Sequence, residues 1–458
     1  MLKFTDIKRR NPEKRDVLQR IKDFDEVYEL LNDNETTRQA SRCIGCGDPY
    51  CHNKCPLHNF IPSWLKQIAN NDLELAFKLS NETSPFPEIL GKICPHDVLC
   101  EGDCTLNDTH GAITIGAVET YVNEKAFENG YKPTFPKVSP MGKKVAIVGS
   151  GPAGLSAATF LIRNGVSVEM FERAGRAGGL LTFGIPGFKL DKAKVQRRID
   201  WLVEAGMKLH LNCEVGKDKS FDDLVHGYDA VFVGIGATKG KTAGLEGENA
   251  SNVHLAMEFL TAIQKRNFGM KVENFIDVKD KNVVVIGGGD TAMDCVRTSV
   301  REGAKSIKCL YRRDENTMPG SKKEVVNAKE EGVEFVFNVS PTKIIASKGV
   351  ATGVELIKTE LDFTTSKRGN LINVAGSEYV ENADVIIYAL GFDQELPTFI
   401  KESGLELDKW NGIKTNENYQ TSNPKIFAGG DAVRGADLAV TATADGRNAA
   451  LKIVELLK

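Results

Sequence analysis

Seven of the ten cysteines in this sequence of 458 residues lie between Cys43 and Cys104. The first four follow the spacing C-x2-C-x4-C-x3-C-P, and the full set is Cys43, Cys46, Cys51, Cys55, Cys94, Cys100 and Cys104. Thiolates at such short spacing on a glycine-containing loop can hold an iron–sulfur cluster, and in runs that end in C-P the last cysteine serves a neighbouring cluster. The spacing therefore predicts iron–sulfur chemistry, with Cys55 as a ligand of a second cluster.

The number of cysteines leaves the ligand set open. Two clusters with four ligands each need one ligand more than the seven cysteines of this segment. Either another kind of side chain is the missing ligand, or only one cluster binds. Zinc is the alternative metal because it also favours four thiolates. Nearby histidines could complete a zinc site: His52, His58, His96 and His110.

The remaining cysteine positions predict structure rather than chemistry. Cys100 and Cys104 lie one helical turn apart, so we expect them to share a helix face. The last three cysteines, Cys213, Cys295 and Cys309, lie in apolar strand or helix patterns. We expect these three to be buried as small hydrophobic residues.

A glycine-rich turn follows the apolar run 145–148, with the spacing G-x-G-x-x-G at Gly149, Gly151 and Gly154. The first glycine allows a tight turn, the second lets a pyrophosphate approach the backbone, and the third lets the next helix lie close to the strand. The N–H groups at the start of that helix attract the diphosphate. The following strand ends at Glu172, where a carboxylate can accept a hydrogen bond from a ribose hydroxyl.

A second turn of the same kind follows a strand at residues 283–286 and comprises Gly287, Gly288, Gly289, Asp290 and Thr291. The next strand ends in Arg312 and Arg313. An acid there would favour the free 2′-hydroxyl of NAD, whereas arginine favours a 2′-phosphate. The second turn therefore predicts NADP(H), with Lys322 and Lys323 as further positive charge; a solvated basic face is the alternative.

Near its end the chain has a strand followed by Gly429, Gly430 and Asp431, and a helix is expected to start near Leu438. Asp431 can bond a sugar-alcohol hydroxyl. The helix start can stabilise an anionic reduced flavin. The paired glycines 178–179 can similarly let the backbone approach a bound ring or phosphate.

Composition excludes several classes of partner. The hydrophobic fraction is 41%, the charged fraction 26% and the net charge −3. These values are those of an ordinary globular protein and give no reason to expect a nucleic acid or a membrane as partner. The N-terminus lacks an apolar signal core, so we expect a cytoplasmic protein. A reducing compartment argues against disulfides.

Taken together, the motifs resemble those of the two-dinucleotide-binding flavoprotein reductases. Over its whole length the chain is similar to the small subunits of bacterial NADPH-dependent glutamate synthases. The similar stretches are 43–56, 93–95, 99–108, 179–189, 287–295, 311–315, 318–321, 427–431 and 442–447.

The resemblance implies FAD at the first turn, NADPH at the second and two 4Fe-4S clusters. It adds to the FAD site Pro152, Ala153, Arg173, Gly179, Leu180, Ala439 and Val440. It implies that one cluster is held by Cys43, Cys46, Cys51 and Cys104. It implies that the other is held by Cys55, Cys94, Cys100 and Glu119.

The fold class expected is α/β, with two Rossmann-like dinucleotide-binding domains, for FAD and NADPH, preceded by a helical iron–sulfur domain. The helical domain is expected at 1–140, with a polar, helical pattern over 1–42 and a proline-rich linker at its end. The FAD-binding domain is expected at 141–278 and 395–458, and the NADPH-binding domain at 279–394.

The chemistry implied by the resemblance is hydride transfer from NADPH to FAD. Single electrons then pass through the clusters to a large subunit that makes glutamate from glutamine and 2-oxoglutarate. A reductase subunit serving another acceptor, such as ferredoxin, is the alternative. A disulfide reductase is disfavoured because no redox C-x-x-C accompanies either dinucleotide unit. A zinc-held interaction module on a flavoprotein is a further alternative.

Overall fold

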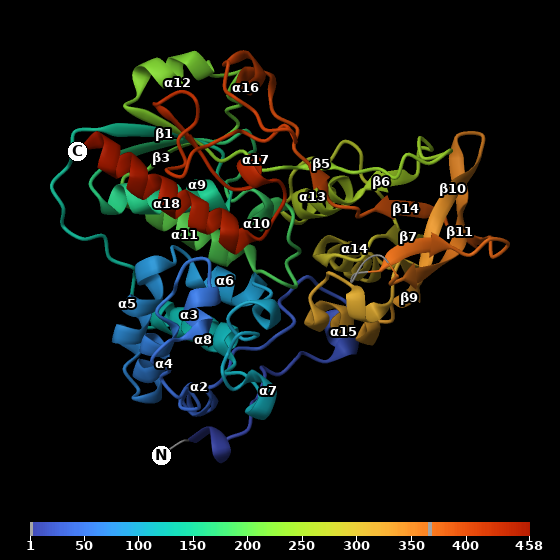
Figure 1. Ribbon diagram of the computed structural model, residues 1–458, viewed down its shortest axis with the longest axis horizontal. Coiled ribbons are helices and arrows are strands. Elements are labelled where there is room, and N and C mark those ends of the chain that lie inside the picture. Colours follow the sequence, from blue (N-terminus) through green and yellow to red (C-terminus); the bar gives the residue numbers. More distant parts are fainter. Residues whose placement is uncertain (1–2, 365–368) are drawn as a thin grey trace.

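The computed structural model describes residues 3–364 and 369–458 and begins with a helical unit (Figure 1). Its helices are η1 (Lys3–Thr5), α1 (Val17–Arg20), α2 (Asp33–Ala40), α3 (Tyr50–Lys54), α4 (Ile61–Ala69), α5 (Leu73–Thr83), α6 (Pro87–Ile93), η2 (His96–Val98), α7 (Asn107–His110) and α8 (Ile115–Glu128). Apolar side chains of α4, α5 and α8 form its core, with Trp64 and Val118 fully buried. Residues 131–141, the expected linker, contain no helix or strand.

The second unit is built on a parallel sheet of order β16-β4-β1-β2-β3. Its strands are β1 (Lys144–Val148), β2 (Ser167–Phe171), β3 (Lys208–His210), β4 (Ala230–Val233) and β16 (Ile426–Ala428). Its helices are α9 (Pro152–Arg163), α10 (Leu180–Phe183), α11 (Lys192–Glu204), α12 (Phe221–Gly227), α16 (Thr398–Glu402), α17 (Asp431–Arg434) and α18 (Ala439–Leu457). Strand β16 comes from the end of the chain, so that segment returns to the first sheet.

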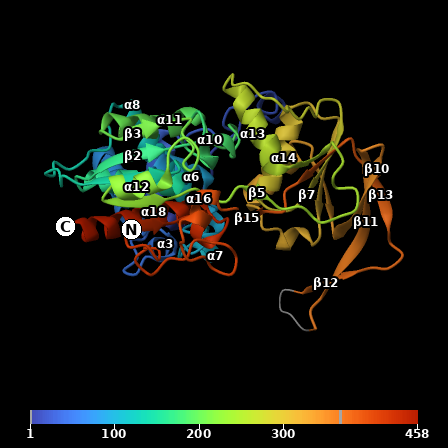
Figure 2. The same ribbon diagram turned by 90° about the horizontal axis from the view of Figure 1, so that it is seen from above.

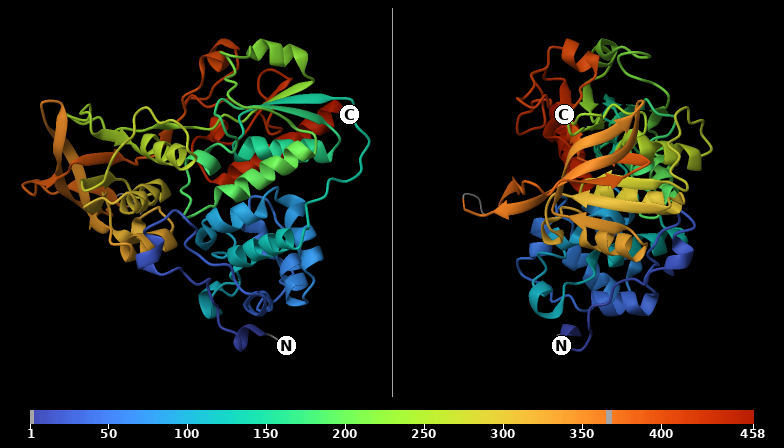
Figure 3. Two further views of the ribbon diagram at one scale, coloured as in Figure 1. Left: turned by 180° about the vertical axis from the view of Figure 1, so that it is seen from behind. Right: turned by 90° about the vertical axis from the view of Figure 1, so that its right-hand side faces the viewer.

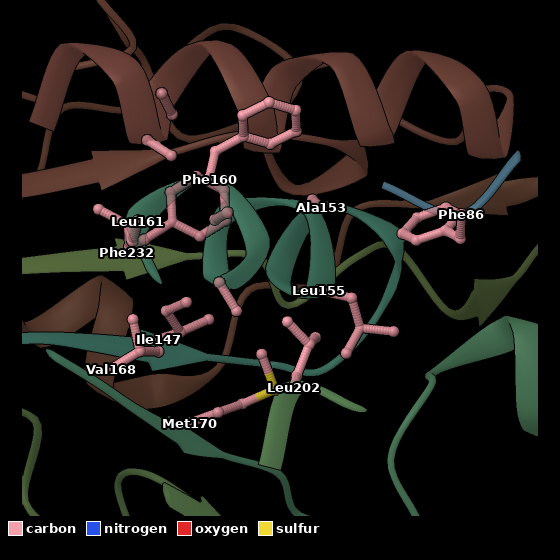
Figure 4. Close-up of a cluster of buried hydrophobic side chains, with 14 of the residues drawn as sticks. Phe86, Ile147, Ala153, Leu155, Phe160, Leu161, Val168, Met170, Leu202 and Phe232 are labelled. Atoms are coloured by element: carbon pink, nitrogen blue, oxygen red, sulfur yellow. The ribbon is translucent and has the colours of Figure 1, made fainter. Parts of the chain in front are cut away.

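The core of this second unit lies between the sheet and helices α9 and α11. Figure 4 shows Ile147, Val168 and Met170 of the strands beneath α9. Phe86, from the helical unit, belongs to the same buried cluster. The helical unit and the first sheet therefore share one continuous apolar core, which fixes their relative position.

The third unit contains a second parallel sheet, of order β6-β14-β7-β8-β9. Its strands are β6 (Val253–Leu255), β7 (Asn282–Ile286), β8 (Ser306–Tyr311), β9 (Glu334–Phe337) and β14 (Val385–Tyr388), and its helices are α13 (Ala256–Asn267), α14 (Asp290–Arg301), η3 (Glu315–Thr317) and α15 (Lys322–Glu330). This sheet begins with β6, which precedes the boundary predicted at residue 279. The two parallel sheets and the helical unit before them confirm the expected fold class.

An antiparallel sheet extends the third unit, made by β10 (Val339–Ser347), β11 (Val350–Asp362), β12 (Asn370–Asn373) and β13 (Tyr379–Asn382). Figures 2 and 3 show its β12 end projecting away from the body of the molecule. A short pair, β5 (Lys239–Gly240) with β15 (Phe392–Asp393), joins the two connections between the sheets. No helix within residues 3–364 and 369–458 has the length and apolar character needed to cross a bilayer.

Within the helical pattern expected for 1–42, α2 is a helix as expected, but residues 10–32, here called the N-terminal strap, are largely not helical. Only the single turn of α1 is helical, and the strap folds back so that Lys14 lies opposite Tyr28. Pro12 and a run of charged residues prevent a longer amphipathic helix. Figure 1 shows this segment in dark blue, reaching across to α15.

The strap contacts all three units. Arg20 pairs with Glu331, at the end of α15, and Glu26 accepts hydrogen bonds from Lys92 of α6 and Lys194 of α11, each at 2.6 Å. A Cβ added to Gly187 would lie 2.6 Å from the carbonyl oxygen of Phe24, so glycine there lets the strap pass. The strap therefore fastens the third unit to the other two.

Candidate functional site

Four cysteines line a cavity at one end of the helical unit: Cys43, Cys46, Cys51 and Cys104. They come from the turn after α2, from α3 and from the segment before α7. The Sγ of Cys46 lies 3.3 Å from the Oγ1 of Thr105. The rest of the lining is largely apolar and includes Leu65 and Ile115.

A second cavity is lined by Cys55, Cys94, Cys100 and Glu119. Glu119 projects from α8 and is 9% exposed. The Nδ2 of Asn59 donates to its Oε1 at 2.9 Å, and the indole of Trp64 donates to the Oδ1 of Asn59 at 3.2 Å. This chain of hydrogen bonds orients the Glu119 carboxyl. Asn59 belongs to no motif and was not predicted.

The two cavities divide these eight side chains into the same two groups of four that the resemblance implies. Burial raises the pKa of the Cys51 thiol to about 12 and the pKa of Glu119 to about 8. Burial also raises the pKa of Cys94 and Cys100 well above the usual range for thiols. Such groups ionise only beside a compensating cation, so the donor sets fit a positively charged iron group and would release protons on binding it.

The spacing of the donors disfavours zinc. Zinc holds thiolate sulfurs about 2.3 Å from one point, but no group of three or more His, Cys, Asp or Glu side chains in the described part of the chain converges on a single-ion site. The four donors of each cavity line its wall without converging on one point, an arrangement that suits a polynuclear cluster.

The expectation that Cys100 and Cys104 share a helix face is wrong. The carbonyl oxygen of His96 accepts hydrogen bonds from the N–H groups of Glu101 and Gly102, at 2.9 and 3.0 Å. This closes a turn in place of a helix, so Cys100 lines the second cavity and Cys104 the first.

Two of the remaining cysteines, Cys295 and Cys309, are fully buried as expected. Cys213 differs, because it is half-buried in the loop after β3.

The first dinucleotide turn joins β1 to α9. A Cβ on Gly154 would lie 2.0 Å from the carbonyl oxygen of Gly149, and a Cβ on Gly149 would lie 2.5 Å from that of Gly234. In contrast, a Cβ on Gly151 would meet no atom within 4 Å. Helix α9 begins at Pro152 and its first N–H groups have no side-chain cap. This open space before uncapped N–H groups fits a diphosphate.

Glu172 is tied to this turn by hydrogen bonds. Its Oε2 accepts from the N–H of Ser150 at 3.0 Å and from the Ser150 hydroxyl at 2.5 Å. The Ser150 oxygen in turn accepts from the N–H of Gly178 at 3.0 Å. Ser150 therefore connects the predicted acid to the predicted 178–179 loop. Arg173 is exposed, and Leu180 opens α10.

The C-terminal segment closes over the same turn. Gly430 has φ +70°, and a Cβ there would lie 3.1 Å from the Cβ of Ala153. Asp431 opens α17, and burial raises its pKa to about 7. Helix α18 begins at Ala439 without a side-chain cap. Val440, in its first turn, packs in the same cluster as Ala153 and also lines the second cysteine cavity, so the start of α18 lies beside both the first dinucleotide turn and that cavity.

The second dinucleotide turn joins β7 to α14. A Cβ on Gly287 would lie 2.3 Å from the carbonyl oxygen of Ala389, and one on Gly288 would meet the Tyr311 ring at 2.4 Å, whereas Gly289 faces open space. Asp290 accepts from the N–H of Ser321 at 3.0 Å. That bond fixes the 318–321 segment beside the turn. Thr291 is half-buried at the start of α14.

The predicted arginines lie where β8 ends. Arg312 is exposed, and the guanidinium of half-buried Arg313 donates to the carbonyl oxygen of Gly369 at 3.1 Å. Lys322 is exposed at the start of α15. Lys323 donates to the carbonyl oxygen of Lys92 at 3.1 Å, at the end of α6. Lys323 therefore connects the third unit to the helical unit.

Comparison with known proteins gives the class. Residues 20–131 match the family model described as dihydropyrimidine dehydrogenase domain II, 4Fe-4S cluster. Residues 143–446 match the model described as pyridine nucleotide-disulphide oxidoreductase. FprA from Mycobacterium tuberculosis, solved in complex with NADPH, has the same fold over 68% of this chain and 84% of its own, with a TM-score of 0.59 and 20% identity. The protein is thus an oxidoreductase of the two-dinucleotide class with an N-terminal iron–sulfur domain.

The sequence relatives identify the family within this class. The NADPH glutamate synthase small chain of Escherichia coli (strain K12) is 49% identical over 99% of this chain and 98% of its own length. The oxidoreductase AegA of the same organism is 47% identical over 98% of this chain and 70% of its own length. This chain belongs to the family of NADPH glutamate synthase small chains, as the resemblance of its motifs indicated.

Proposed function

We propose that this chain is the electron-input subunit of glutamate synthase. In this proposal NADPH binds at the second dinucleotide turn, FAD binds at the first, and a 4Fe-4S cluster binds in each cysteine-lined cavity. Electrons leave through the clusters to a large subunit that makes glutamate from glutamine and 2-oxoglutarate. A reducing compartment, the cytoplasm, would keep these cysteines as thiols able to bind the clusters.

The observation that carries this proposal is that neighbouring sites share lining residues. Val440 belongs both to the start of α18, beside the first dinucleotide turn, and to the lining of the second cavity. Ile115 lines both cysteine cavities. The second cavity therefore shares Val440 with the start of α18, beside the first dinucleotide turn, and shares Ile115 with the first cavity. Such an arrangement suits one-electron transfer away from a flavin.

The residues proposed to hold each group follow from the geometry above. The uncapped start of α9 would bind the FAD diphosphate, and the uncapped start of α18 would lie at the flavin ring. The first cavity would hold its cluster through Cys43, Cys46, Cys51 and Cys104. The second would use Cys55, Cys94, Cys100 and Glu119. When bound, FAD supplies the conversion of a two-electron hydride into single electrons.

The chain purified without oxygen tests the cofactor assignment directly. We expect one FAD and about eight iron atoms per chain, the content of two four-iron clusters. Mixed with the large subunit, the chain should support NADPH-dependent formation of glutamate. A chain that carries zinc instead of iron, or only FMN, would contradict the proposal.

Glu119→Ala tests the proposed eighth ligand. We expect loss of the second-cavity cluster, retained FAD and normal reduction of FAD by NADPH, but no electron transfer to the large subunit. Glu128→Ala is the matched control because Glu128 lies on the same helix and is exposed. Full iron content and normal electron transfer in Glu119→Ala would show that the ligand lies elsewhere.

AegA supports a second candidate, an NADPH-dependent reductase with another acceptor. Since its similarity covers nearly all of this chain but 70% of its own length, the same arrangement occurs in a longer oxidoreductase. The two candidates differ only in the acceptor. Rapid NADPH-dependent reduction of ferredoxin, combined with no glutamate formation beside the large subunit, would favour the second candidate.

A further inference from the structure

Two residues that line the second cysteine cavity each have a buried polar atom without a hydrogen-bond partner. These atoms are the hydroxyl Oγ of Ser84 and the Nε2 of His96. Ser84 is 1% exposed and follows the end of α5. Among the described residues neither atom has a partner, which is costly for a buried polar group. A group bound in this cavity would supply the missing partner.

The backbone holds the His96 ring against α8. A Cβ on Gly116 would lie 2.3 Å from the Nε2 of His96, so the glycine makes room for the imidazole. Gly116 precedes Glu119 by one helical turn and therefore lies on the same face. With a proton on Nε2, the imidazole is a hydrogen-bond donor.

The first cavity lacks an equivalent pair. Its lining is apolar apart from the cysteines, the hydroxyl of Tyr50 and Thr105, whose Oγ1 already lies 3.3 Å from the Sγ of Cys46. The two cavities thus differ in the hydrogen-bond donors that they offer to sulfur.

We propose that Ser84 and His96 are positioning residues that donate hydrogen bonds to sulfur atoms of the cluster in the second cavity and raise its reduction potential. This inference rests on the proposed function, which puts a cluster there. A reduced cluster carries one more negative charge, so donors to its sulfurs stabilise the reduced form more than the oxidised form. The second-cavity cluster, which lies beside the proposed flavin site, would then accept electrons more readily than a cluster with the same ligands but without these hydrogen bonds.

The test is an anaerobic redox titration of the complete chain with both clusters, followed by electron paramagnetic resonance. The signal that disappears in Glu119→Ala identifies the second-cavity cluster. Ser84→Ala and His96→Leu should each lower its potential, with the constant for one-electron reduction falling about threefold to tenfold; tenfold corresponds to about 59 mV. Iron and FAD contents should stay unchanged.

His96→Gln should restore most of the potential because glutamine keeps a donor. Thr105→Val is the matched control and should leave the second-cavity cluster unaltered. Unchanged potentials in Ser84→Ala and His96→Leu would overturn the inference while leaving the proposed function intact. Loss of the cluster in His96→Leu would also overturn it, because His96 would then be needed to hold the cluster and not to tune its potential. A wild-type chain that binds no iron would overturn both this inference and the proposed function.

Discussion

The Nε of Arg20 lies 3.0 Å from the Oε1 of Glu331, although the two residues are 311 positions apart in the sequence. Both side chains are buried, with exposed fractions of 1% and 0%. Glu331 also accepts hydrogen bonds from Arg297 and Arg301 of α14. One carboxylate therefore bonds three buried guanidinium groups and secures the N-terminal strap to the third unit.

Glu331→Gln should destabilise the third unit by about 3–5 kcal/mol, because buried Arg301 loses its carboxylate partner and Arg20 and Arg297 each lose one of two. Urea unfolding followed by circular dichroism measures this. Lys14→Ala is the control: its pair with Glu330 is partly exposed and should contribute less than about 1 kcal/mol. Equal effects of the two substitutions would show that the buried network is not a stabilising contact.

Stability should also depend on pH through Glu331. Its arginine partners lower its pKa in the folded protein to about 2, below the unfolded value of about 4.3. The stabilisation is therefore complete above about pH 4.5 and is lost as the pH falls toward 2. Unfolding midpoints measured across this range should fall more steeply for the wild type than for Glu331→Gln. Parallel curves would contradict the assignment.

Two neighbouring glycines should respond differently to the same substitution. Gly154→Ala places a Cβ against the Gly149 carbonyl and should cost about 1–3 kcal/mol of stability through overpacking. Gly151→Ala meets open space, so the apoprotein should unfold as the wild type does. It should nevertheless bind FAD about tenfold more weakly, equivalent to about 1.4 kcal/mol. Unaltered FAD affinity in Gly151→Ala would place the diphosphate elsewhere.

Arg312→Ala and Arg313→Ala should each raise the Kd of NADPH about tenfold to a hundredfold, from the loss of a charged hydrogen bond of about 1.5–3 kcal/mol. Binding of NADH should change little. Isothermal titration with both coenzymes measures this. Lys329→Ala removes a positive charge from the same unit, where it pairs with Glu315, and should affect neither coenzyme. Equal losses for NADPH and NADH would exclude a 2′-phosphate contact.

The glycine turns could be predicted from the sequence because their signals are local. An apolar run before Gly149 or Gly287 specifies a buried parallel strand, and the spacing after it specifies the turn. The assignment of Cys100 and Cys104 to different cavities could not be predicted from spacing, because a turn closed by the His96 carbonyl decides it. The roles of Asn59 and Ser150 could not be predicted either, because only the tertiary fold brings their hydrogen-bond partners near.

The N-terminal strap was the largest feature missed. Its sequence is polar and its partners lie in other units, so no periodicity within residues 10–32 indicates where it binds. Only the carboxylates at the end of α15 and the lysines of α6 and α11 explain its charges.

The strap also has a consequence for biosynthesis. At about 5–20 residues per second, the ribosome needs roughly 15–60 s to add the 311 residues that separate Arg20 from Glu331. Until translation has passed residue 331 the strap has no acceptor on α15, whereas the helical unit and strands β1 to β4 are synthesised before that point. The contacts of Glu26 with Lys92 and Lys194 can therefore form first, and the contact of the strap with α15 forms last.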